Sequence, residues 1–199
     1  MHAQFSQQGE KLVGTGTIGY PEQGVSVALS ADGNTAIIGG WCDNHDVGAA
    51  WVYTRADGTW SQQGDKLVGT GYVGTPEQGV SVAISADGNT AIVGGYYDNS
   101  HTGAAWVYTR SDGVWSQQGT KLVANDAVGH AQEGVSVALA ADGNTAIVGG
   151  WCDNGDAGAA WVYTRTDGVW SQQGNKLVGT GAVGGAIQVP RPGCPARHP

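Results

Sequence analysis

Short segments in which hydrophobic residues alternate with small or polar residues fill most of the chain. Val25, Val27 and Leu29 occupy every second position and therefore share one face of a predicted strand. Asp32-Gly33 follows and predicts a hairpin, because glycine accepts the positive φ that tight turns need. Asp57-Gly58 predicts a second hairpin in the same way. No segment has a helical period, and the strands predicted in this part of the chain cover 24–30, 34–40, 48–55 and 60–68.

The same pattern returns every 55 residues. Ser-Gln-Gln-Gly follows an aromatic residue at Phe5, Trp60, Trp115 and Trp170, and segment 5–59 differs from 60–114 at 14 of 55 positions. Such self-similarity predicts stacked supersecondary units. Four antiparallel strands per unit, A to D, predict an all-β fold, a β-propeller built from four-stranded blades. Within a repeat region that covers 1–184, the predicted blades are 24–68, 79–123 and 134–178, preceded by a stray strand over 5–13.

Each unit carries the same order of glycine-containing motifs. In the first unit these are Gln23-Gly24-Val-Ser-Val-Ala, Asp32-Gly33, an apolar strand that ends in Gly39-Gly40, and Gly48-Ala-Ala-Trp-Val-Tyr. This order resembles the FG-GAP repeat, which builds propellers in integrin-like heads and in many bacterial surface and secreted proteins. The resemblance covers residues 5 to about 184. It departs from the family where Gln-Gly stands for Phe-Gly, and where Gly-Gly-Trp stands for Gly-Ala-Pro.

Three blades leave the predicted propeller open. Three blades cannot surround a central channel, and an unclosed end exposes a blade surface rich in Val, Ala and Ile. The chain is therefore expected either to associate with copies of itself or to be a fragment of a larger propeller. A homodimer is favoured, because two copies supply six blades. The segment 185–199 is Pro-rich and is predicted to be disordered.

The differences between units gather at one end of the predicted blades. Most of them fall in the loops between strands B and C and in the links from strand D to the next strand A, and loops on a rigid scaffold often carry binding residues. Aromatic rings that stand beside Asp and Asn suit a sugar, because the ring stacks on the pyranose while the polar groups bond its hydroxyls. The alternative is that these loops vary freely and that their aromatic residues only cap the strand ends. The predicted ligand-binding residues are Trp41, Asp43, Asn44, Tyr96, Tyr97, Asp98, Asn99, Trp151, Asp153 and Asn154.

Metal binding is not predicted. Many members of the resembled family hold calcium in an Asp-rich turn, but the matching turn here has the single carboxylate of Asp32, and calcium takes six to eight oxygen ligands. The loops 43–46 and 153–156 each contain two carboxylates and leave calcium as an alternative, although Asp and Asn are also common turn formers. No zinc-ligand spacing occurs. We therefore expect no cofactor.

Composition and charge exclude several classes of function. Nine Lys and Arg against seventeen Asp and Glu give a net charge of −8, which argues against nucleic acid as a partner. No apolar stretch is long enough for a membrane span, and the first residues do not resemble a signal peptide. No motif of a nucleophilic or phosphate-binding enzyme appears.

The predicted function is therefore a non-catalytic binding module. It is an adhesion-type or glycan-binding propeller whose partner is a saccharide or a cell-surface ligand. A purely structural repeat array is one alternative, and a propeller hydrolase or lyase is another. The family resemblance implies a secreted or cell-surface protein.

Overall fold

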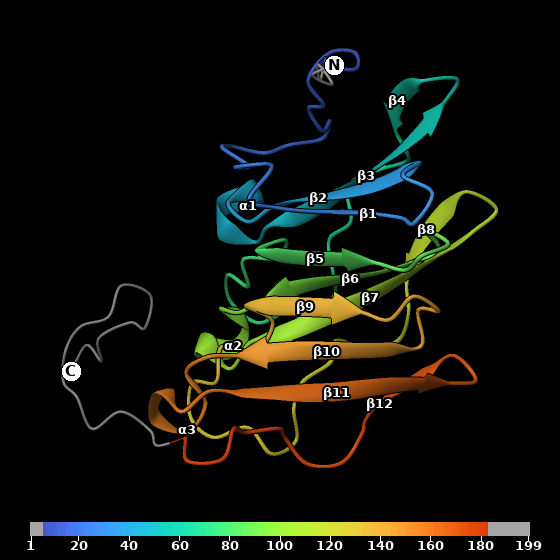
Figure 1. Ribbon diagram of the computed structural model, residues 1–199. Helices are drawn as coiled ribbons and strands as arrows, with labels where there is room; N and C mark the ends of the chain where they lie inside the picture. Colours follow the sequence, from blue (N-terminus) through green and yellow to red (C-terminus); the bar gives the residue numbers. More distant parts are fainter. Residues whose placement is uncertain (1–5, 183–199) are drawn as a thin grey trace, which may run out of the picture.

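The computed structural model describes residues 6–182, which form three four-stranded antiparallel sheets (Figure 1). In each sheet the strands are ordered as they occur in the sequence. The predicted all-β class and the four-stranded blades are therefore confirmed. Blade 1 consists of β1 (Ser26–Leu29), β2 (Thr35–Gly40), β3 (Ala49–Ala56) and β4 (Thr59–Gln62). Blade 2 consists of β5 (Ser81–Ile84), β6 (Thr90–Gly95), β7 (Ala104–Ser111) and β8 (Val114–Gln117). Blade 3 consists of β9 (Ser136–Leu139), β10 (Thr145–Gly150), β11 (Ala159–Thr166) and β12 (Val169–Gln172).

The Asp-Gly pairs make the turns that the sequence predicts. Asp57 and Gly58 have φ values of 49° and 77°, as a two-residue hairpin between twisted strands requires. At the other hairpin of blade 1, Asp32 accepts hydrogen bonds from the Ser30 hydroxyl at 2.5 Å and from the Asn34 backbone N–H at 2.9 Å. A carboxylate that bonds its own turn in this way stabilises the local chain reversal.

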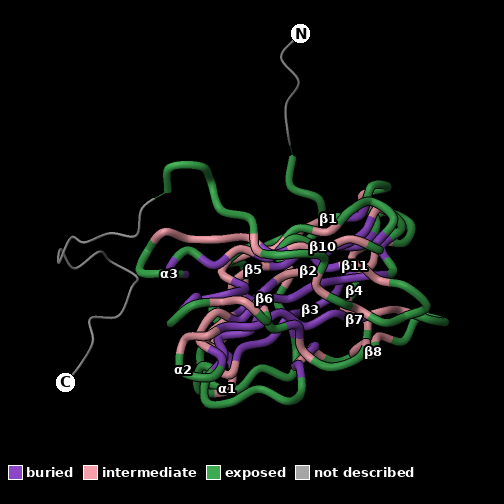
Figure 2. The backbone as a smooth tube through the Cα atoms, turned by 90° about the horizontal axis from the view of Figure 1, so that it is seen from below, coloured by how far each residue is buried: buried purple, intermediate pink, exposed green. Residues whose placement is uncertain are grey.

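One tryptophan per blade fills the core. Trp51, Trp106 and Trp161 are fully buried, and the indole N–H of each donates to the link that precedes its blade. Figure 2 shows the buried segments running through the middle of the array, with the loops exposed around them. The three tryptophans therefore recur at one repeat position because each packs in the core of its blade.

Adjacent blades approach each other at their inner strands. The Ser26 hydroxyl donates to the Gly79 carbonyl at 2.7 Å, and the Ser81 hydroxyl donates to the Gly134 carbonyl at 2.8 Å. These serines recur because they join one blade to the next. A Cβ atom at Gly94 would overlap the Gly134 carbonyl and the Ser81 side chain, so this junction requires glycine.

We expect Gly94→Ala to lower the free energy of unfolding by about 2 kcal/mol, because the added methyl group forces two blades apart. Urea unfolding followed by tryptophan fluorescence measures the effect. Gly179→Ala is the control, since a Cβ there meets no atom within 4 Å. An equal and small effect of both substitutions would contradict the close contact between the blades.

The blades do not close into a ring, so the described chain is an open, partial propeller. The stray strand predicted over 5–13 is not formed by its described part, because residues 6–13 have no strand structure. An outer D strand pairs with the C strand of its own blade, and no described residue supplies that C strand here. The predicted disordered segment 185–199 lies outside the described residues.

Candidate functional site

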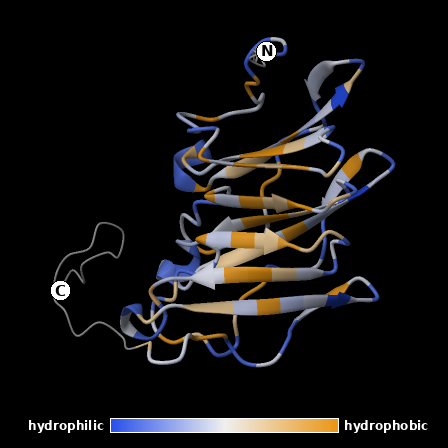
Figure 3. Ribbon diagram, in the orientation of Figure 1, coloured by the Kyte–Doolittle hydropathy of each residue, from blue (hydrophilic) through white to orange (hydrophobic). Residues whose placement is uncertain are grey.

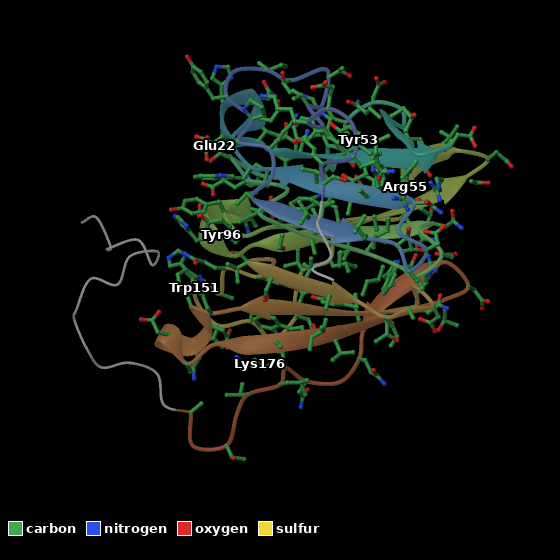
Figure 4. All side chains as sticks on the ribbon, turned by 45° about the horizontal axis from the view of Figure 1, so that its top comes forward. Glu22, Tyr53, Arg55, Tyr96, Trp151 and Lys176 are labelled. Atoms are coloured by element: carbon green, nitrogen blue, oxygen red, sulfur yellow. The ribbon has the colours of Figure 1, made fainter. Side chains whose placement is uncertain are left out.

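The loops between strands B and C lie together at one end of the array, opposite the Asp-Gly hairpins (Figure 1). They contain the short turns α1 (Asp43–Asp46), α2 (Asp98–His101) and α3 (Asp153–Asp156). We call these turns, with the links 17–22, 72–77 and 127–132, the loop face. In Figure 4, Glu22, Tyr96 and Trp151 follow this edge of the molecule, whereas Arg55 lies toward the other end.

Each turn of the loop face winds in the left-handed sense. Asn44, His45 and Asp46 in α1 have φ values of 52°, 57° and 65°. For L-residues such a conformation costs about 1–2 kcal/mol per residue, although Asn and Asp tolerate it better than most. The same conformation occurs in all three turns, including Ser100 and His101 of α2. Surrounding contacts must therefore hold these turns in place.

A buried aspartate at the start of each turn supplies those contacts. In blade 3, the Asp153 carboxylate accepts a hydrogen bond from the Val128 backbone N–H at 2.6 Å and pairs with the Lys176 ammonium at 2.6 Å. Asp43 pairs with Lys66 in blade 1, and Asp98 pairs with Lys121 in blade 2. Each carboxylate thus ties the turn to the preceding link and to the outer part of its own blade.

The structure therefore separates the predicted ligand-binding residues into two groups. Asp43, Asp98 and Asp153 are fully buried, and both carboxylate oxygens of each have partners inside the protein. Their side chains support the loop face from beneath. The other predicted residues reach solvent, either half-buried or exposed: Trp41, Asn44, Tyr96, Tyr97, Asn99, Trp151 and Asn154.

An aromatic residue follows strand B in every blade and lies near the link of the same blade. The Trp41 indole N–H donates to the Glu22 carboxylate at 2.9 Å, and the Trp151 indole N–H donates to the Gln132 side chain. In blade 2, the Tyr96 hydroxyl lies near the Glu77 carboxylate, and burial together with this carboxylate raises the pKa of Tyr96. These three aromatic residues occupy one repeat position at the loop face and are called the aromatic row. Trp151 is the most open of them, with 44% of its surface exposed.

Glu77, in the link of blade 2, is buried. Burial raises the pKa of its carboxyl to about 7, the Tyr96 hydroxyl bond opposes that rise, and the charge of Asp46 adds to it. The loop face thus contains a carboxyl group that changes its protonation state near neutral pH. The corresponding Glu22 of blade 1 is exposed.

Blade 2 has a second aromatic residue at the loop face. The Tyr97 ring contacts the Tyr96 ring with centroids 4.8 Å apart and the His101 ring at 4.0 Å. Burial lowers the pKa of His101, and the charge of the nearby His130 lowers it further. In blade 1, Cys42 occupies the position of Tyr97, and burial raises the pKa of its thiol to about 11, so that the thiol is protonated at neutral pH.

Exposed apolar residues in the links also belong to the loop face. Tyr20 is 88% exposed, and Tyr72 is 37% exposed. Ile18, Val73 and Val128 recur at one repeat position and are all exposed. None of these residues was among the predicted ligand-binding residues. One sequence feature could have identified them: an apolar residue precedes a glycine in every link, outside every predicted strand.

The described residues 6–182 contain no group of three or more His, Cys, Asp or Glu side chains that could hold a metal ion. At α1 and α3, where calcium was the alternative, a lysine already pairs with the buried aspartate. No helix in the described part of the chain is long and apolar enough to cross a membrane.

Comparison with known proteins identifies one part of the chain with a repeat family. Residues 115–163 match the FG-GAP repeat, which confirms the resemblance found in the sequence motifs. The match and the blade architecture together indicate an interaction module. No curated protein sequence matches the chain.

Two solved structures show the extent of the structural likeness. Sqt1 from Saccharomyces cerevisiae is similar at 15% sequence identity and a TM-score of 0.49, over 77% of this chain and 35% of that chain. TolB from Acinetobacter baumannii is similar at 13% identity and a TM-score of 0.44, over 79% of this chain and 32% of that chain. The chain thus spans about a third of the length of each of these proteins.

Proposed function

We propose that the chain is a non-catalytic binding module that recognises a neutral saccharide through the loop face. The observation that carries the proposal is the aromatic row of Trp41, Tyr96 and Trp151, one aromatic side chain per blade at the same repeat position. Rings that recur once per blade offer successive stacking platforms to the repeating rings of a glycan.

Polar groups beside this row suit the hydroxyl groups of a sugar. Asn99 and Asn154 are exposed at the turns, and each amide can both donate and accept hydrogen bonds. Their positions depend on left-handed turns that are held by buried Asp–Lys pairs, so the site would be largely formed before the ligand arrives.

The charge of the loop face restricts the class of ligand. Glu22, Asp46 and Asp156 are exposed there, and the whole chain has a net charge of −8. Like charges repel an anionic glycan, so a neutral saccharide fits better. The exposed Tyr20 and Tyr72 extend the apolar part of the surface around the row. By family resemblance, we propose a secreted or cell-surface location, where such ligands occur.

A glycan array with the wild-type chain tests the proposal, and titration calorimetry then measures the affinity for the best neutral ligand. We expect a dissociation constant in the micromolar to millimolar range. Trp151→Ala should weaken binding at least about fivefold, because the loss of a large aromatic contact with the ligand typically costs more than 1 kcal/mol.

Trp60→Ala is the matched control. Trp60 lies beside the Asp57-Gly58 hairpin at the opposite end, with the Arg55 guanidinium 5.3 Å from its ring centroid. The same loss of an indole there should leave the affinity unchanged. If no saccharide binds, or if Trp151→Ala binds as well as wild type, the loop face does not recognise glycans and the structural repeat array becomes the better explanation.

A further inference from the structure

Blade 1 and blade 3, at the two ends of the array, expose opposite faces of their sheets. On blade 1, Val27 and Leu29 of the inner strand are 67% and 60% exposed, whereas Val82 and Ile84 at the same positions of blade 2 are each 8% exposed. These positions, with Ile38, are called the front face. On blade 2 the front face is covered by the preceding blade, and on blade 1 it is open.

On blade 3, the face of the sheet that points away from blade 2 is open. Leu177 is 54% exposed, whereas Leu67 and Leu122 at the same repeat position are each 7% exposed. Ile147 is 39% exposed, whereas its counterpart Ile92 is fully buried. Ile147, Val162 and Leu177 are called the rear face. Figure 3 shows hydrophobic residues in the middle of β10 and β11, the strands that carry much of this face.

The internal junctions show what covers each face. Val82 and Ile84 of blade 2 belong to one hydrophobic cluster with Ile37, Val52 and Leu67 of blade 1. The second junction repeats this arrangement between blade 3 and blade 2. In both cases, the front face of one blade packs on the rear face of the blade before it.

The open faces carry the residues that form these junctions. Val27 and Leu29 are identical to Val137 and Leu139, which pack on blade 2. The rear face of blade 3 is identical, residue for residue, to Ile92, Val107 and Leu122, which blade 3 covers on blade 2. We infer that the front face of one copy of this chain docks on the rear face of a second copy, with the contacts that already join blade 2 to blade 3.

Polar groups at the edges of the junction would fix the register of docking. Between blades 1 and 2, the Ser26 hydroxyl bonds the Gly79 carbonyl, and the Ala31 N–H bonds the Ala86 carbonyl at 3.0 Å. Ser136 and the Ala141 N–H stand at the equivalent positions of blade 3. They would meet the carbonyls of Gly24 and Ala31 in the second copy.

The segment 6–13 lies at the outer part of the front face but leaves the inner part open. Gln8 accepts a hydrogen bond from Arg55 at 3.1 Å, as Gln63 does from Arg110 at the first junction. A cleft of about 450 Å³ separates this segment from Tyr53 and Trp60, so the segment does not seal the blade. In a docked pair, Gln173 of the second copy occupies the repeat position of Gln8 and would replace it.

Because the two faces differ, the interface is heterologous, and two copies can form it twice. Two such junctions join six blades in one closed dimer. Native mass spectrometry and sedimentation should therefore give twice the chain mass of 20.3 kDa for the wild-type chain. A monomer at every concentration up to the millimolar range would overturn the inference.

Two charge substitutions distinguish this geometry from other modes of association. Leu29→Asp alters only the front face, and Leu177→Asp alters only the rear face. Both side chains are more than half exposed in the single chain, so neither change should disturb its fold, which circular dichroism verifies. Each variant alone should be monomeric at a concentration at which the wild type is dimeric.

An equimolar mixture of the two variants should form a heterodimer. The front face of the Leu177→Asp chain is intact and can dock on the intact rear face of the Leu29→Asp chain. Val114→Asp is the control, since Val114 is 68% exposed at the hairpin end and belongs to neither face, and it should remain dimeric. If the Leu177→Asp variant dimerises alone, or if the mixture stays monomeric, the association is not front to rear.

Discussion

Asp98→Asn is expected to destabilise the protein by about 3 kcal/mol, although the substitution removes only a charge. Asp98 is fully buried, and its carboxylate accepts the Val73 N–H at 2.8 Å and pairs with Lys121. The amide oxygen of Asn can keep the first bond, but its NH₂ group then faces the ammonium. Breaking a buried ion pair by removing one partner costs about 3–5 kcal/mol. We expect a cost at the lower end of this range, because the Lys121 side chain is 18% exposed and can reach water.

Urea unfolding at neutral pH measures this effect. Asp112→Asn makes the same chemical change at an exposed hairpin residue with φ of 51°, a conformation that Asn adopts readily, and should be neutral. The double variant Asp98→Asn/Lys121→Gln should lose less stability than the two single variants combined, because the residues interact. Additive losses would mean that the pair does not hold the turn. The central blade is the right place for the test, since terminal units of repeat proteins can unfold separately.

Much of the fold follows from local sequence signals. The period of 55 residues, the alternation in each strand and the Asp-Gly pairs predict the three sheets and their hairpins. These signals are local, because a strand's face and a turn's φ depend on a few neighbouring residues. Residues 6–13 show the limit of this reasoning: they have the sequence of an outer strand, but they form none without a strand to pair with.

The candidate site was less predictable because its support is distant in sequence. Asp98 and Lys121 are 23 residues apart, and nothing in the loop sequence indicates that Asp98 is buried rather than open to a ligand. The left-handed turns were equally hidden, since Asn, Ser and His in sequence do not specify that conformation. Residue differences between equivalent positions of the three units are visible in the sequence. One of these differences has a measurable effect on stability.

This difference places a glutamate in the core of blade 3. Gln78 of blade 2 is replaced by Glu133, which is also fully buried. Glu133 accepts hydrogen bonds from the Tyr163 hydroxyl at 2.6 Å and from the Ala124 N–H at 2.7 Å. Burial nevertheless raises the pKa of its carboxyl to about 7, and the nearby Asp126 adds to the rise.

This raised pKa makes stability depend on pH in a definite direction. Between pH 4.5 and 7 the folded chain keeps a proton on Glu133 that the unfolded chain has lost, so stability falls as the pH rises. Each pKa unit corresponds to 1.36 kcal/mol, which gives a loss of about 3 kcal/mol by pH 8. Glu77 contributes in the same direction, since burial raises its pKa to about 7 as well.

Glu133→Gln isolates the contribution of this one carboxyl. The difference in free energy of unfolding between the variant and the wild type should shift by about 3 kcal/mol in favour of the variant between pH 4.5 and pH 8. Gln78→Glu in blade 2 is the reciprocal test: it should introduce the same pH dependence and offer an acceptor to the Tyr108 hydroxyl, which is buried without a partner. A difference between Glu133→Gln and wild type that is constant with pH would show that the Glu133 carboxyl is ionised in the folded chain. In that case, the hydrogen bonds from Tyr163 and Ala124 would outweigh the cost of burying its charge.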